Sequence, residues 1–252
     1  MDLLIQFPTR KRKEKFFTYL SQYIETLSGA NNVAININCD TDDEEMNNKE
    51  TISQIQFIFE DVELPPGNGI IAAPIVNFDG NVSKIEAVNR NLDNKNFDVV
   101  ILASDDMWPV RPNWDEEIRK GYEEFFPDYD GVLHFNDGYV ASKLNTLCIL
   151  GKPYYDRFGY IYHPDYKSVF CDNEFMEVSR ELSKAQYFDT VIIEHRHCIW
   201  MGEKGDLLYR ANDMHDKSDA DTFFKRKTLG FPLESILSPL KHPASFRYPM
   251  SQ

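Results

Sequence analysis

The sequence predicts an α/β protein in which a central sheet carries helices on its faces, built as one domain with a C-terminal extension. The first half of the chain alternates between strand-like and helix-like segments, which is the pattern of such a sheet. Residues 98–103 are almost continuously apolar, as in a central strand buried on both faces. A content of 42% hydrophobic and 13% aromatic residues among 252 is ample for a packed core.

The chain begins with a predicted strand, a helix and a second strand. Residues 3–7 form a short apolar strand closed by Pro8. Apolar residues recur at helical spacing over 16–27, and Gly29 is expected to cap the end of this helix. Apolar and polar residues then alternate over 33–39, which indicates a strand that ends at Cys39 and Asp40.

The middle of the chain continues the alternation. Pro65, Pro66 and Gly67 interrupt it before a third strand, and Pro109 and Pro112 exclude regular structure for a few residues. The elements expected here are a helix around 51–59, a strand near 69–75, a helix from about 83 to 92, the strand at 98–103, a helix over 114–126 and a strand over 131–135.

The second half is less periodic. It predicts a helix near 172–184 and a strand near 190–194. From Asp213 the sequence becomes charged and then rich in proline, which favours a terminal helix followed by an extended tail.

Charge and composition exclude several classes of protein. With 27 Lys and Arg against 41 Asp and Glu, the formal net charge is −14, which disfavours nucleic acid as a partner. No run reaches the roughly 18 apolar residues of a membrane span, and the N-terminus lacks the pattern of a secretory signal, so we expect a cytoplasmic protein. The four cysteines are scattered without a CxxC pair, which predicts reduced, buried thiols.

Polar and charged side chains collect where the predicted strands end. They are Thr9 and Arg10, residues 40–43, Ser104 with Asp105 and Asp106, and Asn136 with Asp137. In an open α/β sheet, ligands bind outside the carboxyl ends of the strands. Carboxylates crowded at one edge repel each other unless a cation lies among them, and their oxygen atoms favour Mg²⁺ or Mn²⁺ over Zn²⁺. Taken singly, each aspartate is equally well explained as a helix cap or turn residue.

These segments, in this order, resemble the nucleotide-sugar-binding half of GT-A fold glycosyltransferases, especially the family 2-like inverting enzymes. The resemblance rests on residues 7–10, Asp40 to Asp43, Lys84 with residues 87–89, and residues 102–106, and it extends over about residues 2–200. It implies a Rossmann-like mixed sheet. The domain would span residues 1–210, with a nucleotide-sugar-binding half at 1–106 and an acceptor-binding half at 107–210. Residues 211–252 would form a C-terminal helix and tail.

The resemblance implies a site for a nucleoside diphosphate and a divalent cation. In the family an Asp-x-Asp motif ends the central strand and holds Mn²⁺ or Mg²⁺ against the donor diphosphate. Here Ala103 stands at its first position, so metal binding would rest on Asp105 and Asp106, with His197 or His195 as a later ligand. The donor would be a UDP-sugar, or a GDP-sugar, and UDP is favoured on family grounds. Donor contacts would come from Pro8, Thr9, Arg10, Asp40, Asp42, Lys84, Ser104, Asp105, Asn136 and Asp137.

Inverting transfer also needs a general base for the acceptor hydroxyl. The segment at 170–175 lies where the family carries an acidic pair, and there Asp172 matches the second acid while Cys171 replaces the first. We expect Asp172 to be the base, with Glu174 as the alternative. Asp172 is also suited to be the N-cap of its helix. Sugar-stacking faces are expected among Trp108, Trp114, Tyr139, Tyr154 and Tyr155, although aromatic residues are more often found in cores.

The leading hypothesis is therefore a metal-dependent inverting glycosyltransferase that moves a sugar to an acceptor hydroxyl, in glycan synthesis. A sugar-phosphate nucleotidyltransferase is an alternative, but it would need a glycine-rich turn after the first strand, where this chain has Pro8-Thr9-Arg10-Lys11. A catalytically degenerate sugar-nucleotide-binding protein is another, favoured by Ala103 and Cys171. The segment 223–227 mixes basic and aromatic residues, which leaves peripheral membrane contact open.

Overall fold

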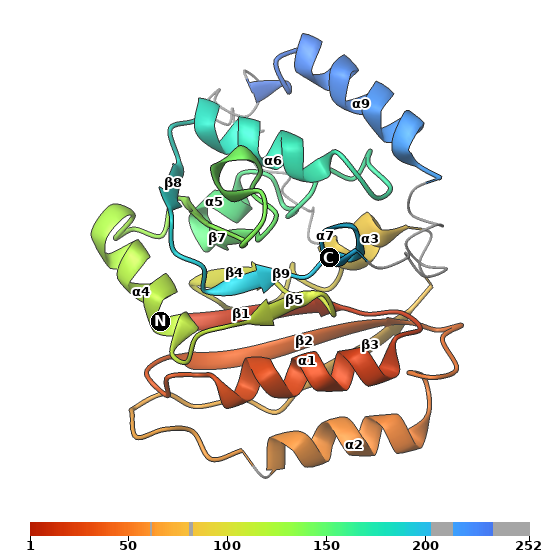
Figure 1. Cartoon of the computed structure of the whole chain (residues 1–252), viewed down its shortest axis with the longest axis vertical. Coiled ribbons are helices and arrows are strands. Elements are labelled where there is room, and N and C mark those ends of the chain that lie inside the picture. Colours follow the sequence, from red (N-terminus) through yellow and green to blue (C-terminus); the bar gives the residue numbers. More distant parts are fainter. Residues whose placement is uncertain (61, 81–82, 203–213, 234–252) are drawn as a thin grey trace, which may run out of the picture.

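A seven-stranded sheet forms the centre of the molecule in the computed structural model, which describes residues 1–60, 62–80, 83–202 and 214–233. The strand order is β3-β2-β1-β4-β7-β6-β8 (Figure 1). Strands β3, β2, β1 and β4 run parallel to one another, whereas β7 runs antiparallel to both β4 and β6. The sheet is therefore mixed, as predicted. Because these four strands are parallel, their carboxyl ends share one edge.

Most of the predicted elements are present within a few residues of their expected ends, and several short elements are present in addition. The elements of the first half are β1 (Asp2–Pro8), α1 (Lys13–Glu25), β2 (Asn32–Asp40), α2 (Lys49–Glu60), β3 (Ile75–Asp79), α3 (Lys84–Asn89), β4 (Val99–Leu102), β5 (Met107–Pro109) and α4 (Trp114–Phe125). Those of the second half are β6 (Val132–Phe135), η1 (Ala141–Lys143), β7 (Ile149–Gly151), α5 (Lys152–Asp156), α6 (Cys171–Glu181), β8 (Ala185–Phe188), β9 (Ile193–His195), α7 (Cys198–Met201) and α9 (Asp216–Thr228). The elements that were not predicted are β5, η1, β7, α5, β8 and α7.

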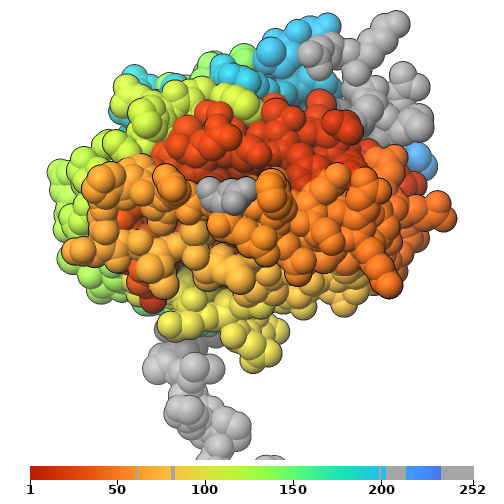
Figure 2. All heavy atoms as spheres, turned by 90° about the horizontal axis from the view of Figure 1, so that it is seen from below, coloured from red at the N-terminus to blue at the C-terminus, as the bar shows by residue number. Residues whose placement is uncertain are grey.

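Each face of the sheet has its own hydrophobic core. Side chains of a strand alternate between faces, so Leu3 and Ile5 of β1 belong to one core while Leu4 belongs to the other. The first core includes residues of α1, α2 and α4, and the second includes residues of α3, α5, α6 and α9. Figure 1 shows α1 and α2 on one side of the sheet and α5 and α6 on the other. From below, α1 and the segment containing α2 cover most of the visible surface (Figure 2).

The third strand starts later than the pattern predicted. Residues 69–75 contribute only a single bridge, between Ile71 and Val33, and regular pairing with β2 begins at Ile75. Pro74 separates the two segments, and proline has no N–H to give to a ladder. The predicted strand at 69–75 is therefore wrong in its position, though the sheet does contain a strand in this part of the chain.

Gly29 serves a different purpose from the predicted helix cap. Helix α1 ends at Glu25 with Thr26 as its cap. Gly29 has φ +72, and a Cβ built on it would lie 2.3 Å from the carbonyl oxygen of Pro65. Its hydrogen atom thus allows the Pro65 loop to pass closely, a packing requirement that local sequence does not show.

The short strand β5 was not expected, since Pro109 and Pro112 were predicted to exclude regular structure there. Met107, Trp108 and Pro109 pair antiparallel with β9. Pro109 ends the strand, where its missing N–H costs little. The resulting ribbon brings β9, and the two histidines near its end, beside the segment that follows β4.

Helix α9 packs on α6 and is tied to the loop before it. The Arg226 guanidinium donates to the Glu174 carboxylate at 2.8 Å, and the Lys227 ammonium donates to Glu177 at 2.6 Å. Phe223 is buried in the same contact, so Phe223, Arg226 and Lys227 pack α9 on the domain, whereas Phe224 is exposed. The predicted proline-rich tail lies mostly outside the described residues. Among the described helices, none has the length and apolar character needed to cross a membrane.

Candidate functional site

A cavity of about 510 Å³ opens at the carboxyl ends of the parallel strands. Its walls come from the segments after β1, β2 and β4, from the start of α3, from the loop before α6, and from β9 and α7. This volume suits a drug-sized or nucleotide-sized ligand. Of the predicted site residues, it is lined by Pro8, Thr9, Arg10, Asp40, Lys84, Ser104, Asp105, Asp106, Asp172, His195 and His197. The tertiary structure thus gathers most of the predicted residues into one hollow.

Arg10 connects the ends of the first two strands. Its guanidinium forms an ion pair with the buried Asp40, and it donates to both oxygens of Asp42, at 2.8 and 2.7 Å. The Arg10 contact lowers the pKa of Asp42. Asp40 lines the cavity, whereas the exposed Asp42 carboxylate does not. The pairs hold the Arg10 side chain against the β2 end, so Asp42 reaches the site only through Arg10.

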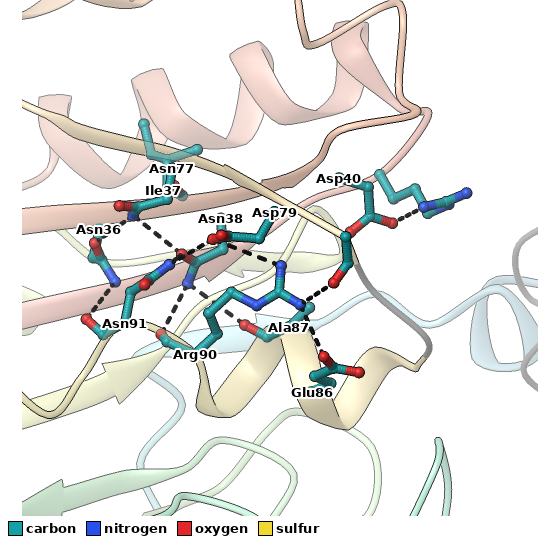
Figure 3. A network of polar contacts seen from close by, with 12 residues as sticks. Asn36, Ile37, Asn38, Asp40, Asn77, Asp79, Glu86, Ala87, Arg90 and Asn91 are labelled. Atoms are coloured by element: carbon teal, nitrogen blue, oxygen red, sulfur yellow. Dashed lines mark hydrogen bonds and ion pairs between the residues drawn. The ribbon is translucent and has the colours of Figure 1, made fainter.

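A buried polar network supports the same edge of the sheet (Figure 3). The Asn38 amide oxygen accepts from Asn77 at 3.1 Å and from Asn91 at 3.0 Å, and Asn77 also donates to Asn36. Arg90, just after α3, donates to the Gly80 carbonyl. Buried amides remain stable when they satisfy one another in this way. The network joins β2 and β3 to the end of α3, whose first residues line the cavity.

The carboxylate pair after β4 is already partly neutralised by the protein. The Asp105 carboxylate accepts from the Arg12 guanidinium at 2.7 Å, and both side chains are more than nine-tenths buried. Burial raises the pKa of Asp105 to about 6; Arg12 acts against this rise, and the neighbouring Asp106 adds to it. Asp106 accepts a hydrogen bond from the Ser104 hydroxyl. The Ser104 hydroxyl is therefore bound to Asp106.

His195 lies across from Asp106. Its Nε2 atom is 3.7 Å from a carboxylate oxygen of Asp106, and its ring centroid is 5.6 Å from that of His197. Within the described ranges, no three His, Cys, Asp or Glu side chains converge tightly enough to hold a metal by themselves. Magnesium commonly binds one or two carboxylates and completes its shell with substrate phosphates and water. Asp106 and His195, beside Asp105, fit a cation completed in that way.

Several buried polar atoms of the cavity have no hydrogen-bond partner among the residues that the structure describes. They are the Thr9 hydroxyl, the Ser168 hydroxyl and the Nδ1 atom of His195. Buried polar atoms nearly always have a hydrogen-bond partner, either in the protein or in a bound molecule. Three such atoms on one cavity indicate a binding site for a polar ligand.

Asp172 lines the cavity from the start of α6. It is partly buried, and burial raises its pKa while the ammonium group of Lys84 acts to lower it. Phe170, with φ +60, occupies the N-cap position, so the predicted N-cap role of Asp172 is not observed. The alternative base, Glu174, accepts from Tyr166 and Arg226 and does not line the cavity. Glu174 is buried under α9 and lies outside the cavity, so the geometry favours Asp172 over this alternative base.

Asn136 and Asp137 do not line the cavity. The Asp137 carboxylate accepts from the backbone N–H of Tyr139, Val140 and Ala141 and from the Thr146 hydroxyl. Asn136 donates to Asp189. Asp137 thus shapes the loop that places Val140 and Thr146 on the cavity wall. Asp137 therefore contributes to the cavity only through this loop. The sequence pattern alone could not distinguish that structural role from direct contact with a sugar.

The predicted stacking residues divide into core and surface. Trp114, Tyr154 and Tyr155 are buried in the core, which is the more usual place for aromatic residues, so they offer no face to a sugar. Tyr139 is exposed and lies parallel to Trp200, with ring centroids 6.2 Å apart. Trp108 packs against the Arg196 guanidinium. Sequence analysis missed Trp200, which lines the cavity, because it follows no predicted element.

Two other contributions to the cavity were missed. Arg12 belongs to the basic run at 10–13, of which only Arg10 was predicted to reach the site. Residues 167–169 line the wall beside Asp172, and their three backbone N–H groups all donate to the buried Asp219 of α9. No local pattern links residues so far apart in sequence.

No protein-family model and no curated protein matches this sequence. Solved structures do match its fold. The UDP-GlcNAc complex of S. aureus TarS 1-349 is similar with a TM-score of 0.57 at 11% identity, over 82% of this chain and 60% of that one. The mannosyltransferase PcManGT from Pyrobaculum calidifontis, in complex with GDP-Man and Mn²⁺, has a TM-score of 0.53 at 11% identity, over 75% of this chain and 54% of that one.

The fold is that of GT-A glycosyltransferases. At 11% identity the likeness establishes the fold alone. The chain also spans only 37% of S. aureus TarS, with a TM-score of 0.52 and 12% identity over 78% of its own length. The function therefore rests on the residues of the cavity.

Proposed function

We propose that the protein is a metal-dependent inverting glycosyltransferase that uses a nucleoside-diphosphate sugar, with a UDP-sugar favoured over a GDP-sugar. The observation that carries the proposal is the cavity itself. It brings together cationic groups, polar atoms without a partner among the described residues, an aspartate pair beside a histidine at the β4 end, and a separate aspartate of raised pKa at the start of α6.

The donor would lie along the carboxyl ends of β1, β2 and β4. The Thr9 hydroxyl, which has no partner among the described residues, would bind the nucleoside. The Asp40 carboxylate lines the same cavity and would accept a hydrogen bond from a ribose hydroxyl or from an N–H group of the base. Arg10, Arg12 and Lys84 supply positive charge to a diphosphate in an otherwise acidic protein. In support, one structural neighbour is a complex with UDP-GlcNAc, and another is a complex with GDP-Man and Mn²⁺.

Asp106 and His195 would hold the cation, with Asp105 available at their side. The cation would stabilise the negative charge of the departing nucleoside diphosphate. Two contacts within the protein position Asp106 for this role. The Ser104 hydroxyl donates to the Asp106 carboxylate, and the backbone N–H of Arg196 donates to the Asp106 carbonyl at 2.7 Å. These contacts fix the end of β4 relative to β9.

Asp172 would take the proton from the acceptor hydroxyl. Burial raises its pKa, which makes its carboxylate a stronger proton acceptor than an ordinary aspartate. Lys84 lies close enough to act electrostatically on Asp172, so it opposes the rise in this pKa. An attacking hydroxyl on this wall would face a donor held at the strand ends.

A panel of nucleotide sugars with Mn²⁺ tests the donor site. The melting temperature of the protein should rise with one nucleoside diphosphate sugar, and a ligand at 100 times its Kd adds about 2.7 kcal/mol of stability. Removal of Mn²⁺ by EDTA should weaken this binding and abolish transfer. If no nucleotide or nucleotide sugar raises the melting temperature, the proposal is wrong.

Asp172→Asn tests the base. The variant should bind the donor as the natural protein does and should lose most of its turnover, because an amide cannot accept the proton. Glu181→Gln, at the exposed end of the same helix, is the matched control and should retain turnover. Loss of donor binding in Asp172→Asn would show that Asp172 has a structural role instead.

A further inference from the structure

Arg12 differs from the other cationic residues of the cavity because it forms an ion pair with Asp105, a carboxylate that a divalent cation would also bind. It precedes α1 as the N-cap residue, yet its side chain makes no cap hydrogen bond. Its guanidinium instead reaches the end of β4 and donates to the Asp105 carboxylate at 2.7 Å. Both residues line the cavity, and their side chains are only 9% and 7% exposed.

A divalent cation at the aspartate pair would meet this guanidinium at close range. Two positive charges a few ångströms apart in a buried site repel each other strongly, since little water screens them. Arg12 and the cation therefore compete for the carboxylate of Asp105. Without the donor, the internal ion pair has the advantage that its two partners are already in place.

A diphosphate changes this balance. It brings negative charge into the same cavity, and arginine binds phosphate oxygens with paired N–H donors as readily as it binds a carboxylate. If the guanidinium turns from Asp105 to the diphosphate, the Asp105 carboxylate loses its ion pair with Arg12 and is left facing the Asp106 carboxylate. A divalent cation would then relieve the repulsion between the two carboxylates.

We propose that Arg12 exchanges Asp105 for the donor diphosphate, so that donor binding releases Asp105 to the divalent cation and the two ligands bind cooperatively. This inference rests on the proposed nucleotide-sugar site. Because coupling between two ligands is reciprocal, the cation must strengthen donor binding by the same factor. The protein would hold a cation tightly only when the donor is present.

Mn²⁺ binding, measured by the electron paramagnetic resonance signal of free Mn²⁺, tests the exchange without requiring turnover. The natural protein should bind Mn²⁺ weakly alone and more tightly with UDP or GDP, by about tenfold after correction for the complex of Mn²⁺ with free nucleotide. Arg12→Gln should bind Mn²⁺ alone several-fold more tightly, show a smaller nucleotide effect, and bind the nucleotide more weakly in EDTA. Arg119→Gln on α4 removes the same charge from pairs with Glu116 and Glu123, and it should behave as the natural protein does.

Two further variants isolate the pair. Arg12→Lys keeps the charge and should bind Mn²⁺ alone as weakly as the natural protein, which also covers the case in which Arg12→Gln does not fold. In an Asp105→Asn background, Arg12→Gln should no longer strengthen Mn²⁺ binding.

The outcomes separate this inference from the proposed function. If neither nucleotide binds any form, both fail. If a nucleotide binds but Arg12→Gln leaves Mn²⁺ affinity and the coupling unchanged, or if its gain persists with Asp105→Asn, only the exchange is refuted, and Arg12 is a permanent counter-ion.

Discussion

Removal of the Asp219 carboxylate should disrupt both the stability of the protein and one wall of the cavity. Asp219 lies in the first turn of α9 and is 1% exposed. It accepts from the backbone N–H groups of Lys167 at 3.1 Å, Ser168 at 2.8 Å and Val169 at 3.0 Å. Asp219→Ala would leave these donors without their acceptor and separate α9 from the loop before α6.

The size of the effect follows from these contacts. A hydrogen bond to a charged group contributes about 1.5–3 kcal/mol, so three of them set an upper bound of about 9 kcal/mol. Water and rearrangement of the loop replace part of this loss. We therefore expect the free energy of unfolding to fall by about 3 kcal/mol, within the range of a broken buried network.

Urea denaturation measures the loss, and UDP titration measures the damage to the cavity. Asp221→Ala, an exposed aspartate of the same helix, is the matched control and should change stability by less than about 0.5 kcal/mol. Asp219→Ala should also weaken nucleotide binding, since residues 167–169 line the cavity. A loss below about 1 kcal/mol with unchanged nucleotide affinity would show that the carboxylate does not hold this loop.

Three other predictions follow from single contacts. Thr9→Val should leave the melting temperature nearly unchanged and weaken UDP binding, because the Thr9 hydroxyl has no partner in the described part of the chain; equal affinity in the two proteins would contradict this. Asn38→Ala should lower the free energy of unfolding in urea by about 2 kcal/mol, because its amide oxygen accepts two buried hydrogen bonds, and a neutral result would mean that the network rearranges at no cost. Burial acts to raise the pKa of Asp130, but hydrogen bonds from Arg157 and Lys184 outweigh it, so this pKa is lowered in the folded protein. Asp130 therefore contributes stability above its unfolded pKa of about 3.9, and this contribution is lost as the pH falls through the lower folded value. Asp130→Asn should accordingly flatten the acid side of the stability profile below about pH 4, and an unchanged profile would refute this role.

The strand ends show how far local patterns reached. The sequence predicted where β1, β2 and β4 stop, because in each case an apolar run gives way to proline or aspartate. Their parallel arrangement then made a shared edge inevitable, and most of the predicted donor residues do meet there. The polar positions of β2 were read only as the alternation of a strand. That Asn36 and Asn38 are buried in an amide network depends on Asn77 and Asn91, which only folding brings near.

Carboxylates were harder to assign. Asp137, Asp172 and Glu174 look alike in sequence, since each lies at the end of a strand or the start of a helix. In the structure, Asp137 binds the backbone of its own loop, Glu174 pairs with Arg226, and only Asp172 lines the cavity. A carboxylate can accept hydrogen bonds from backbone N–H groups, from an arginine or from a substrate, and its neighbours in space decide which of these it binds.

The sequence by itself therefore determined the α/β class, the order of most elements and the edge of the sheet at which the cavity opens, because these follow from the spacing of apolar residues and from turn chemistry within a few positions. The tertiary structure alone decided which acids face the cavity, that Arg12 pairs with Asp105 across 93 positions, and that α9 holds a cavity wall through Asp219. Those contacts join residues far apart in the chain, and their energies depend on burial and distance, which no local pattern contains.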